Sequence, residues 1–330
     1  MSDTLVAAKP DMRFEQMMEK LKPARVAQVL VLPAIGILLF GLLWQFSASR
    51  IETSLGEFPG PVQVWEQLRG LGQEHVKARE KAAAFYQRQE DRNAKKLAAD
   101  PEATVKWRKY TGKPTFIDQV FTSLLTVTVG FLIANLFAIP IGILCGLSSG
   151  VYKAVNPLIQ LFKPVSPLAW LPLVTMVVSA TYSVEDPLFD KAFLNSAITV
   201  ALCCLWPTLI NTTVGVASID RDLVNVSRVM ALSPLVHVRK IVIPAAIPMI
   251  FTGLRLSLAT GWMVLIAAEM LAQNPGLGKF VWDEFQNGSS DSLGRIMVAV
   301  LVIGLVGFML DKLMLTLQRK VSWDKQAVLR

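Results

Sequence analysis

The chain contains six long apolar runs separated by polar segments. Each is about 20 residues or longer, the length that an α-helix needs to cross roughly 30 Å of hydrocarbon at about 1.5 Å per residue. The runs cover Val26 to Phe46, Ser123 to Leu147, Ala154 to Ala180, Phe193 to Val216, Ile247 to Leu271 and Ile296 to Leu317. The pattern predicts an all-α, polytopic membrane protein with about six transmembrane helices.

The first run follows a charged segment, as the apolar core of a cleavable signal would. It is longer than the roughly 7 to 15 apolar residues of a signal peptide, so we interpret it as a retained anchor. Residues 1–25 then form an N-terminal arm, residues 26–46 the first transmembrane helix, and residues 321–330 a tail.

Basic residues mark three regions that would lie on the same side of a six-span chain. These are the N-terminal arm, the stretch between the fourth and fifth runs, and the inner end of the last run with the tail. The residues are Arg13, Lys20, Lys22, Arg25, Arg228, Arg239, Lys240, Lys312, Arg319, Lys320 and Lys325. Because short cytoplasmic loops collect Lys and Arg, we expect all three regions, and therefore both termini, to be cytoplasmic.

The composition agrees with this topology. Of the 330 residues, 53% are hydrophobic and 18% are charged, a balance typical of membrane proteins. The formal net charge is +8. Because the sequence shows no soluble basic domain, we attribute this charge to contact with anionic membrane lipids and expect no nucleic-acid binding.

Residues 47–115 form a long polar segment on the expected outer side. It includes "QEHVKAREKAAAFYQRQEDRNAKKLAADPEATVKWRKYTGKP", in which acids and bases alternate. Loops longer than about 60 residues escape the charge rule. The pattern predicts a charged, largely helical extracytoplasmic insertion with i, i+4 ion pairs. It serves either as a solvent-exposed spacer or as a contact surface for a partner.

The sequence offers little for catalysis or metal binding. Cys145, Cys203 and Cys204 lie inside apolar runs, where cysteine behaves as a small hydrophobic residue. His75 and His237 lie outside the runs and far apart, so we expect no haem or metal site. The phosphate-binding pattern G-x-x-x-x-G-K-[ST] meets only the poor match "NPGLGKF", so we expect no ATP hydrolysis by this chain.

Few ionisable residues fall within the runs. Glu269 lies near the outer end of the fifth run, Asp311 near the inner end of the sixth, and Lys163 in the inner half of the third. Each is either a charge that snorkels to the membrane interface or a functional group. In the functional interpretation, Glu269 shapes an outer gate and Lys163 attracts an anion.

Prolines interrupt the third run. They are Pro157, Pro164, Pro167 and Pro172. An internal proline frees a carbonyl from the helical ladder, which is tolerated at membrane depth where the carbonyl is buried in protein or lines a cavity. The stretch "KPVSPLAWLP" therefore predicts either the wall of a pathway, with Ser166 and Trp170 as its polar and aromatic members, or a kinked packing helix.

The segment between the fourth and fifth runs has the pattern of a helical hairpin. It includes "NVSRVMALSPLVHVRKIVIPAAIP", residues 225–248. Within "ALSPL", Ser233 is a suitable N-cap and Pro234 suits the first helical position. We expect two short helices joined by a turn and ended by Pro244 and Pro248. Such a hairpin cannot span a bilayer, but it can present its turn to a soluble protein.

This stretch resembles the cytoplasmic coupling loop of binding-protein-dependent ABC importer permeases. The family pattern is Glu-Ala-Ala, three residues, Gly, nine residues, then Ile-x-Leu-Pro. Ile241, Ile243 and Pro244 match its end. Asn225 stands at the first position and lacks the carboxylate for a charge-assisted bond to a partner arginine. Ala231 replaces the glycine and resists the left-handed turn that glycine accepts.

Other stretches support the resemblance. "KPVSPLAWLP", "LWPTLINTTVGV", "IFTGLRLSLATGW", "AAEML" and "GKFVWDEFQN" follow in the order and approximate spacing of the nitrate, bicarbonate and taurine or sulfonate branch of these permeases. They are most similar to the nitrate and bicarbonate members. The resemblance covers roughly residues 116–320 and leaves the N-terminal arm and residues 47–115 largely unmatched.

The resemblance implies a type I ABC importer permease fold for residues 116–320, with a coupling loop at about residues 217–246. It implies two copies of this chain, two ABC ATPase subunits that hold ATP and Mg, and an extracytoplasmic solute-binding protein, assembled at the bacterial inner membrane. The mechanism would be alternating access, with no cofactor on this chain. The implied coupling residues are Asn225, Val229, Met230, Ala231, Leu232, Ser233, Pro234, His237 and Arg239.

The resemblance favours nitrate, or nitrite, cyanate or bicarbonate, as the transported anion, and taurine or another alkanesulfonate as the alternative. A secondary anion carrier or channel without an ATPase stays open, although paired intramembrane charges are scarce. A membrane-bound enzyme is a third class, but the sequence shows no nucleophile, base and orienting group within reach of one another.

Overall fold

The computed structural model describes residues 31–53, 56–100, 104–182 and 189–321. The expected N-terminal arm, the start of the first apolar run and nearly all of the tail lie outside these ranges. The chain divides into two compact units, one ending at Glu66 and the other beginning at Gln67.

The first unit contains a short apolar helix and a small hairpin. Helix α3 (Leu32–Ala48) corresponds to the first apolar run and has a proline in its first turn, where a missing N–H costs nothing. Strands β1 (Glu52–Thr53) and β2 (Gly56–Glu57) pair antiparallel. The indole N–H of Trp44 donates to the carbonyl of Pro59 at 3.1 Å, tying the helix to the segment after the hairpin.

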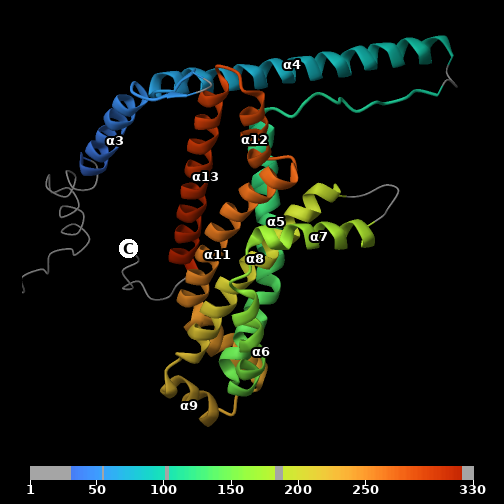
Figure 1. Ribbon diagram of the computed structural model, residues 1–330. Helices are drawn as coiled ribbons and strands as arrows, with labels where there is room; N and C mark the ends of the chain where they lie inside the picture. Colours follow the sequence, from blue (N-terminus) through green and yellow to red (C-terminus); the bar gives the residue numbers. More distant parts are fainter. Residues whose placement is uncertain (1–30, 54–55, 101–103, 183–188, 322–330) are drawn as a thin grey trace, which may run out of the picture. The chain divides into compact units, whose positions relative to one another are not determined.

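The second unit is a helical bundle (Figure 1). Its elements after residue 115 are α5 (Phe116–Leu147), α6 (Ser149–Phe162), α7 (Pro167–Thr181), α8 (Lys191–Ala217), α9 (Arg221–Val229), α10 (Pro234–His237), the π-helical turn η2 (Val238–Val242), α11 (Ile243–Ala272), α12 (Leu277–Asn287) and α13 (Ser292–Val321). Among the described residues, α5, α8, α13 and the continuous stretch Pro234–Ala272 are long and apolar enough to cross a membrane, and α6 with α7 forms a fifth, broken span. Helix α3 is a shorter apolar helix of 17 residues. The all-α, multi-span prediction is confirmed, but the described residues provide four or five spans rather than about six.

The third apolar run is not one kinked helix. Helix α6 ends at Phe162, α7 begins at Pro167, and the two helices meet at 100°. Ser166 precedes a proline and adopts an extended conformation, as sterics before proline favour. Its hydroxyl then accepts from the backbone N–H of Leu168 at 3.3 Å and caps α7. Two helices therefore leave the break in different directions.

Prolines 244 and 248 do not end the hairpin, contrary to the sequence prediction. The chain runs as one helical stretch from Pro234 to Ala272, with η2 directly before Pro244. A proline ring clashes with the carbonyl four residues earlier in an ordinary α-helix, and the wider π-helical turn gives it room. The second arm of the hairpin is thus the beginning of transmembrane helix α11.

Helix α8 lies at the centre of the bundle, between α5 and α11. On one side, a Cβ added at Gly142 of α5 would lie 2.7 Å from the Cβ of Thr212, so only glycine allows this approach. On the other side, the Ser257 hydroxyl donates to the carbonyl of Cys204 at 2.6 Å. Small residues bring membrane helices into such close contact. The cysteines of the core are buried and free, as small hydrophobic residues would be.

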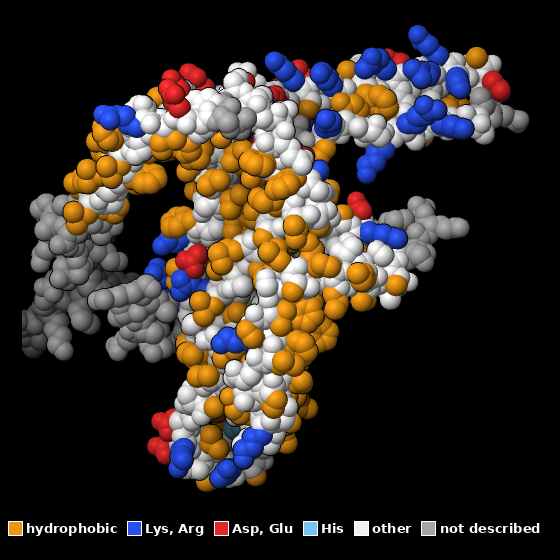
Figure 2. Space-filling view, in the orientation of Figure 1, with side chains coloured by type: hydrophobic (Ala, Val, Ile, Leu, Met, Phe, Trp, Pro, Cys, Tyr) orange, Lys and Arg blue, Asp and Glu red, His pale blue; other side chains and the backbone are white. Residues whose placement is uncertain are grey.

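Helix α4 (Pro61–Ala99) occupies much of the polar segment 47–115. From Gln67 on, it is attached to the bundle by polar contacts: Arg79 pairs with Asp118 of α5, and Glu74 pairs with Arg295 of α13. These ion pairs reach other helices rather than neighbours four residues along α4. Figure 2 shows Lys and Arg side chains gathered along α4, whereas hydrophobic side chains cover most of the bundle.

Candidate functional site

The hairpin between α8 and α11 is built by local capping. The side chain of Asp220 accepts from the backbone N–H of Asp222 at 2.9 Å and begins α9. Helix α9 ends near Val229, and α10 begins with Pro234 at its first turn. The first expected short helix and the turn are therefore confirmed, whereas the second, α10, continues into α11. Ser233 occupies the N-cap position of α10, but its hydroxyl makes no capping bond there, which the sequence prediction had required.

A left-handed alanine closes α9. Leu232 N–H donates to the carbonyl of Ser227 at 3.2 Å, and Ala231 N–H donates to that of Arg228 at 3.0 Å. These two bonds form a Schellman motif, whose residue after the C-cap is usually glycine. Ala231 holds that position with φ 47°. The family pattern places glycine here, so the turn that alanine was expected to resist is nevertheless formed.

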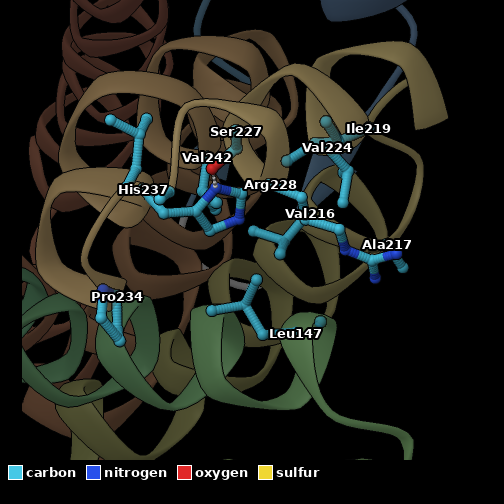
Figure 3. A pocket seen from close by; sticks show the side chains of 13 residues that line it. Leu147, Val216, Ala217, Ile219, Val224, Ser227, Arg228, Pro234, His237 and Val242 are labelled. Carbon is cyan, nitrogen blue, oxygen red and sulfur yellow. Dashed lines mark hydrogen bonds between the residues drawn. The ribbon is translucent and has the colours of Figure 1, made fainter.

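A side-chain contact ties the two arms of the hairpin together. Ser227 Oγ of α9 lies 2.7 Å from His237 Nδ1 of α10 (Figure 3). Ser227 is buried, although it stands where the family pattern has alanine. Because His237 leads directly into η2 and α11, this hydrogen bond links α9 to the transmembrane helix that follows.

The tip of the hairpin exposes large apolar side chains. Val229 is 87% exposed, Leu235 is 84% exposed, and Met230 is also exposed. Arg228 and Arg239 are exposed on the same hairpin. An apolar patch with a basic rim is typical of a surface that docks another protein.

A pocket of about 680 Å³ lies between the hairpin and the adjoining ends of α5 and α8. Figure 3 shows Leu147 of α5, Val216 of α8, and Arg228 and His237 of the hairpin around it. The exposed tip residues Val229, Met230 and Leu235 do not line this pocket.

The structure brings the expected coupling residues together and separates the expected pathway residues. All nine coupling candidates from Asn225 to Arg239 lie on the hairpin. Lys163, Ser166 and Trp170 lie at or beside the break between α6 and α7. Glu269 lies near the end of α11 remote from the hairpin. The four pathway candidates therefore form no single cluster.

Glu269 is not a snorkelling charge, because its side chain is buried, with 1% of the residue exposed. Its carboxylate accepts from the Ser123 hydroxyl at 2.8 Å and from the Gly278 N–H at 2.9 Å. Ser123 Oγ in turn accepts from Leu277 N–H at 2.9 Å. The carboxylate thus joins α5 and α11 to the N-terminus of α12, where a helix favours negative charge.

Three features escaped the sequence analysis. Asp311, for which the sequence left an interface charge or a functional group open, pairs with Arg255, whose Nε donates to Asp311 Oδ1 at 3.0 Å across α11 and α13. Arg255 is the one basic residue of the fifth run. Its ion pair with Asp311 depends on the packing of α11 against α13, which the sequence does not show. Ser227 and Leu235 were likewise recognisable only from the hairpin geometry. Within the described residues, no cluster of His, Cys, Asp or Glu could hold a metal ion.

The bundle of membrane-crossing helices with an exposed hairpin at one end is similar to the fold of a solved transport permease. A solved chain of the MetNI methionine ABC transporter, in an inward-facing form, superposes with a TM-score of 0.53 at 16% identity, covering 63% of this chain and 96% of that one. This likeness shows the type I importer fold, as the sequence resemblance implied.

The sequence comparisons define the family. Residues 138–323 match the binding-protein-dependent transport system inner membrane component family. The nitrate import permease protein NrtB of Synechococcus elongatus is 34% identical over 225 residues, 66% of this chain and 77% of its own. The bicarbonate transport system permease protein CmpB of the same organism is 32% identical over 291 residues, 88% of each chain.

The chain belongs to this family of binding-protein-dependent permeases. It is the membrane component of an ATP-driven importer, and the ATPase and the solute-binding protein are partner chains. Family membership confirms that it is a transport subunit rather than an enzyme, and it places the chain in the nitrate and bicarbonate branch of the inner-membrane permeases.

Replacing Ala231 by glycine should stabilise the hairpin. Glycine adopts the left-handed conformation without the cost of roughly 1 to 2 kcal/mol that a Cβ brings, although it loses more chain entropy on folding. We expect hydrogen–deuterium exchange of the Leu232 amide to slow by about threefold or more. Ala154→Gly, in the regular helix α6, should act oppositely, because glycine destabilises a helix interior. Faster exchange at Leu232 in Ala231→Gly would contradict the Schellman assignment.

Replacing Glu269 by glutamine should destabilise the bundle. The amide NH₂ would face a hydroxyl and a backbone N–H that both need acceptors, and a buried unsatisfied donor costs about 1 to 3 kcal/mol. We expect the thermal unfolding midpoint in detergent to fall by several degrees. Asp283→Asn removes a charge from the exposed Lys279 pair on α12 and should change the midpoint little. Equal midpoints for both variants would remove the anchoring role.

Proposed function

We propose that this chain imports a small inorganic anion, with nitrate as the first choice and bicarbonate as the second. The observation that carries the proposal is the similarity to permeases named for these two anions, at 32% to 34% identity and over as much as 88% of the chain. Much of the selection between solutes would fall to the binding protein, which delivers the anion to the permease.

The assembly we propose contains two copies of this chain, two ATPase subunits that hold ATP and Mg, and one binding protein. The hairpin and both termini would face the cytoplasm, because the exposed Arg228, Arg239 and Lys240 lie on the hairpin and Arg319 and Lys320 lie in the last turn of α13. Basic residues in short segments favour this orientation. The polar segment with α4 would then lie outside, where a binding protein docks.

The exposed tip of the hairpin, which we call the plug, would dock on the ATPase and transmit its motion to the membrane helices. Val229, Met230 and Leu235 would enter a socket on the ATPase, since they are exposed here and apolar side chains are stabilised by burial at an interface. Because α10, η2 and α11 form one helical stretch, a shift of the plug would move α11 along its length. The Ser227 to His237 contact would make α9 follow.

We also retain the break between α6 and α7 as part of the pathway. Ser166 and Trp170 lie at the start of α7, and irregular backbone at membrane depth is tolerated where it lines a cavity. The contacts of Glu269 favour a role in holding α12 in place at the outer end rather than direct contact with the anion.

Transport by the reconstituted complex tests the proposed function. The chain would be isolated with its partners from its own membranes and placed in liposomes, with ATP supplied on the ATPase side. We expect ATP-dependent accumulation of isotopically labelled nitrate or bicarbonate. Accumulation of taurine alone would move the chain to the alkanesulfonate alternative. Anion flux that needs neither ATP nor an ATPase would replace the importer by a carrier or channel.

A charge at the plug tests coupling. Leu235→Asp should lower ATP-driven uptake by tenfold or more, because a carboxylate would have to be buried in an apolar socket. Since Leu235 is almost fully exposed in this chain, the thermal midpoint should not change. Charged residues at Ser233 and Pro234 should act in the same way, and Leu235→Met should keep normal uptake. Normal uptake by Leu235→Asp would remove the hairpin from the coupling path.

A further inference from the structure

A groove with a polar stripe on one side runs along α6. It has a volume of about 440 Å³ and is bordered by α6, by the end of α5 and by α8. Four long polar side chains of α6 line it: Tyr152, Asn156, Gln160 and Lys163. Successive members are three or four residues apart, so they form one stripe on the helix. Across from them, Ile210 and Val214 of α8 provide an apolar wall.

The groove leads from the hairpin end of the bundle toward the break in the third span. Ser149 and Ala217, which also line it, lie at the ends of α6 and α8 next to the hairpin segment. Lys163 lies at the other end, as the C-cap residue of α6. The 14 residues of α6 correspond to about 21 Å of helix, more than half the hydrocarbon thickness of a bilayer.

The stripe presents hydrogen-bond donors and a single positive charge. Gln160 Nε2 donates to Asn156 Oδ1 at 3.4 Å, which leaves the Asn156 amide nitrogen free to donate to another group. Lys163 forms no ion pair with any carboxylate in the described ranges. No Asp or Glu lines the groove. Lys163 is exposed at the C-cap of α6, so its ammonium is available to an anion that enters the groove.

We propose that this groove is the hairpin-side half of the anion pathway, with Lys163 as the residue that attracts the anion at the break and Tyr152, Asn156 and Gln160 as neutral donors below it. The ligand is a small oxyanion, whose oxygens accept from ammonium, amide and phenol donors. This inference rests on the proposed function and names the residues that would line the anion pathway. A phosphate headgroup has the same chemistry, so the experiments distinguish the two sources.

A groove with one positive charge followed by neutral hydrogen-bond donors would let an anion pass through rather than hold it tightly. Ligands must bind well enough to enter a pathway and weakly enough to leave it. The volume could hold on the order of ten water molecules, so a nitrate ion would keep part of its hydration. Only at Lys163 would the anion meet a full opposite charge, and the amides would then receive it without holding it tightly.

Charge removal at Lys163 is the first test. In the reconstituted complex, Lys163→Gln should lower the maximum rate of nitrate uptake by about tenfold, because a unit charge a few ångströms away in a partly aqueous site has an effect of that order. Lys163→Arg should keep most of the uptake, because it retains the positive charge. Lys153→Gln is the matched control, since Lys153 is also exposed on α6 but does not line the groove. Equal uptake by Lys163→Gln and Lys153→Gln would overturn the proposal.

Thiol labelling tests the groove without requiring transport. Gln160→Cys would be made with Cys145→Ala, because Cys145 also lines the groove. A negatively charged thiol reagent should react about tenfold faster than a positively charged reagent of similar size, and Lys163→Gln should bring this ratio close to one. A ratio of one with Lys163 present would overturn the proposal. Complexes that import no nitrate would contradict the proposed function, but the labelling ratio would still report on the groove.

Protection experiments identify the occupant. Labelling of the Gln160→Cys chain would be measured in phosphatidylcholine vesicles, with and without nitrate, and in vesicles that also contain phosphatidylglycerol. Nitrate should slow labelling in both kinds of vesicle. Protection by phosphatidylglycerol with no effect of nitrate would identify a lipid-headgroup site and overturn the pathway assignment.

Discussion

Backbone hydrogen bonding inside a membrane is the constraint on which this structure depends. Hydrocarbon offers no hydrogen-bond partner for a free N–H or carbonyl. The chain therefore crosses as helices, whose backbone groups bond to one another within the helix. Among the departures in the described helices, two bear on function. At the break after Phe162, Ser166 supplies a cap for α7. Before Pro244, a π-helical turn keeps the helix continuous. Each departure coincides with a segment to which we assign a function, the pathway wall and the coupling plug.

The helices between these two places pack closely. Helix α8 approaches α5 through Gly142 and contacts α11 through paired Ser257 and Cys204 bonds. Large side chains would separate the helices, and lipid gives no hydrophobic force to bring them back. In the coupling we propose, a displacement of the hairpin would pass through the continuous α10 to α11 stretch to α8 and α5.

The all-α, multi-span architecture could be predicted because apolar length is a one-dimensional property, although the sequence predicted about six spans and the described residues provide four or five. The hairpin was also predictable, since Pro234 and the family pattern mark its turn. The 100° break, the continuity through Pro244 and the burial of Glu269 were not. Each depends on what a residue contacts from another helix or on which backbone geometry absorbs a proline. Lys163 was recognised as a candidate, but the stripe it shares with Asn156 and Gln160 required the facing surface of α8.

The junction at Glu269 limits how the remote end of this chain can open. One carboxylate holds α5 through Ser123 and α12 through Gly278, and both bonds lie within the buried interior. Separating any two of these helices would strip acceptors from buried donors. A gate within a single copy is therefore expensive, whereas sliding one copy against another breaks none of these bonds. In a paired assembly, the permeation gate would accordingly lie at the interface between subunits. It would open by movement of one whole subunit relative to the other.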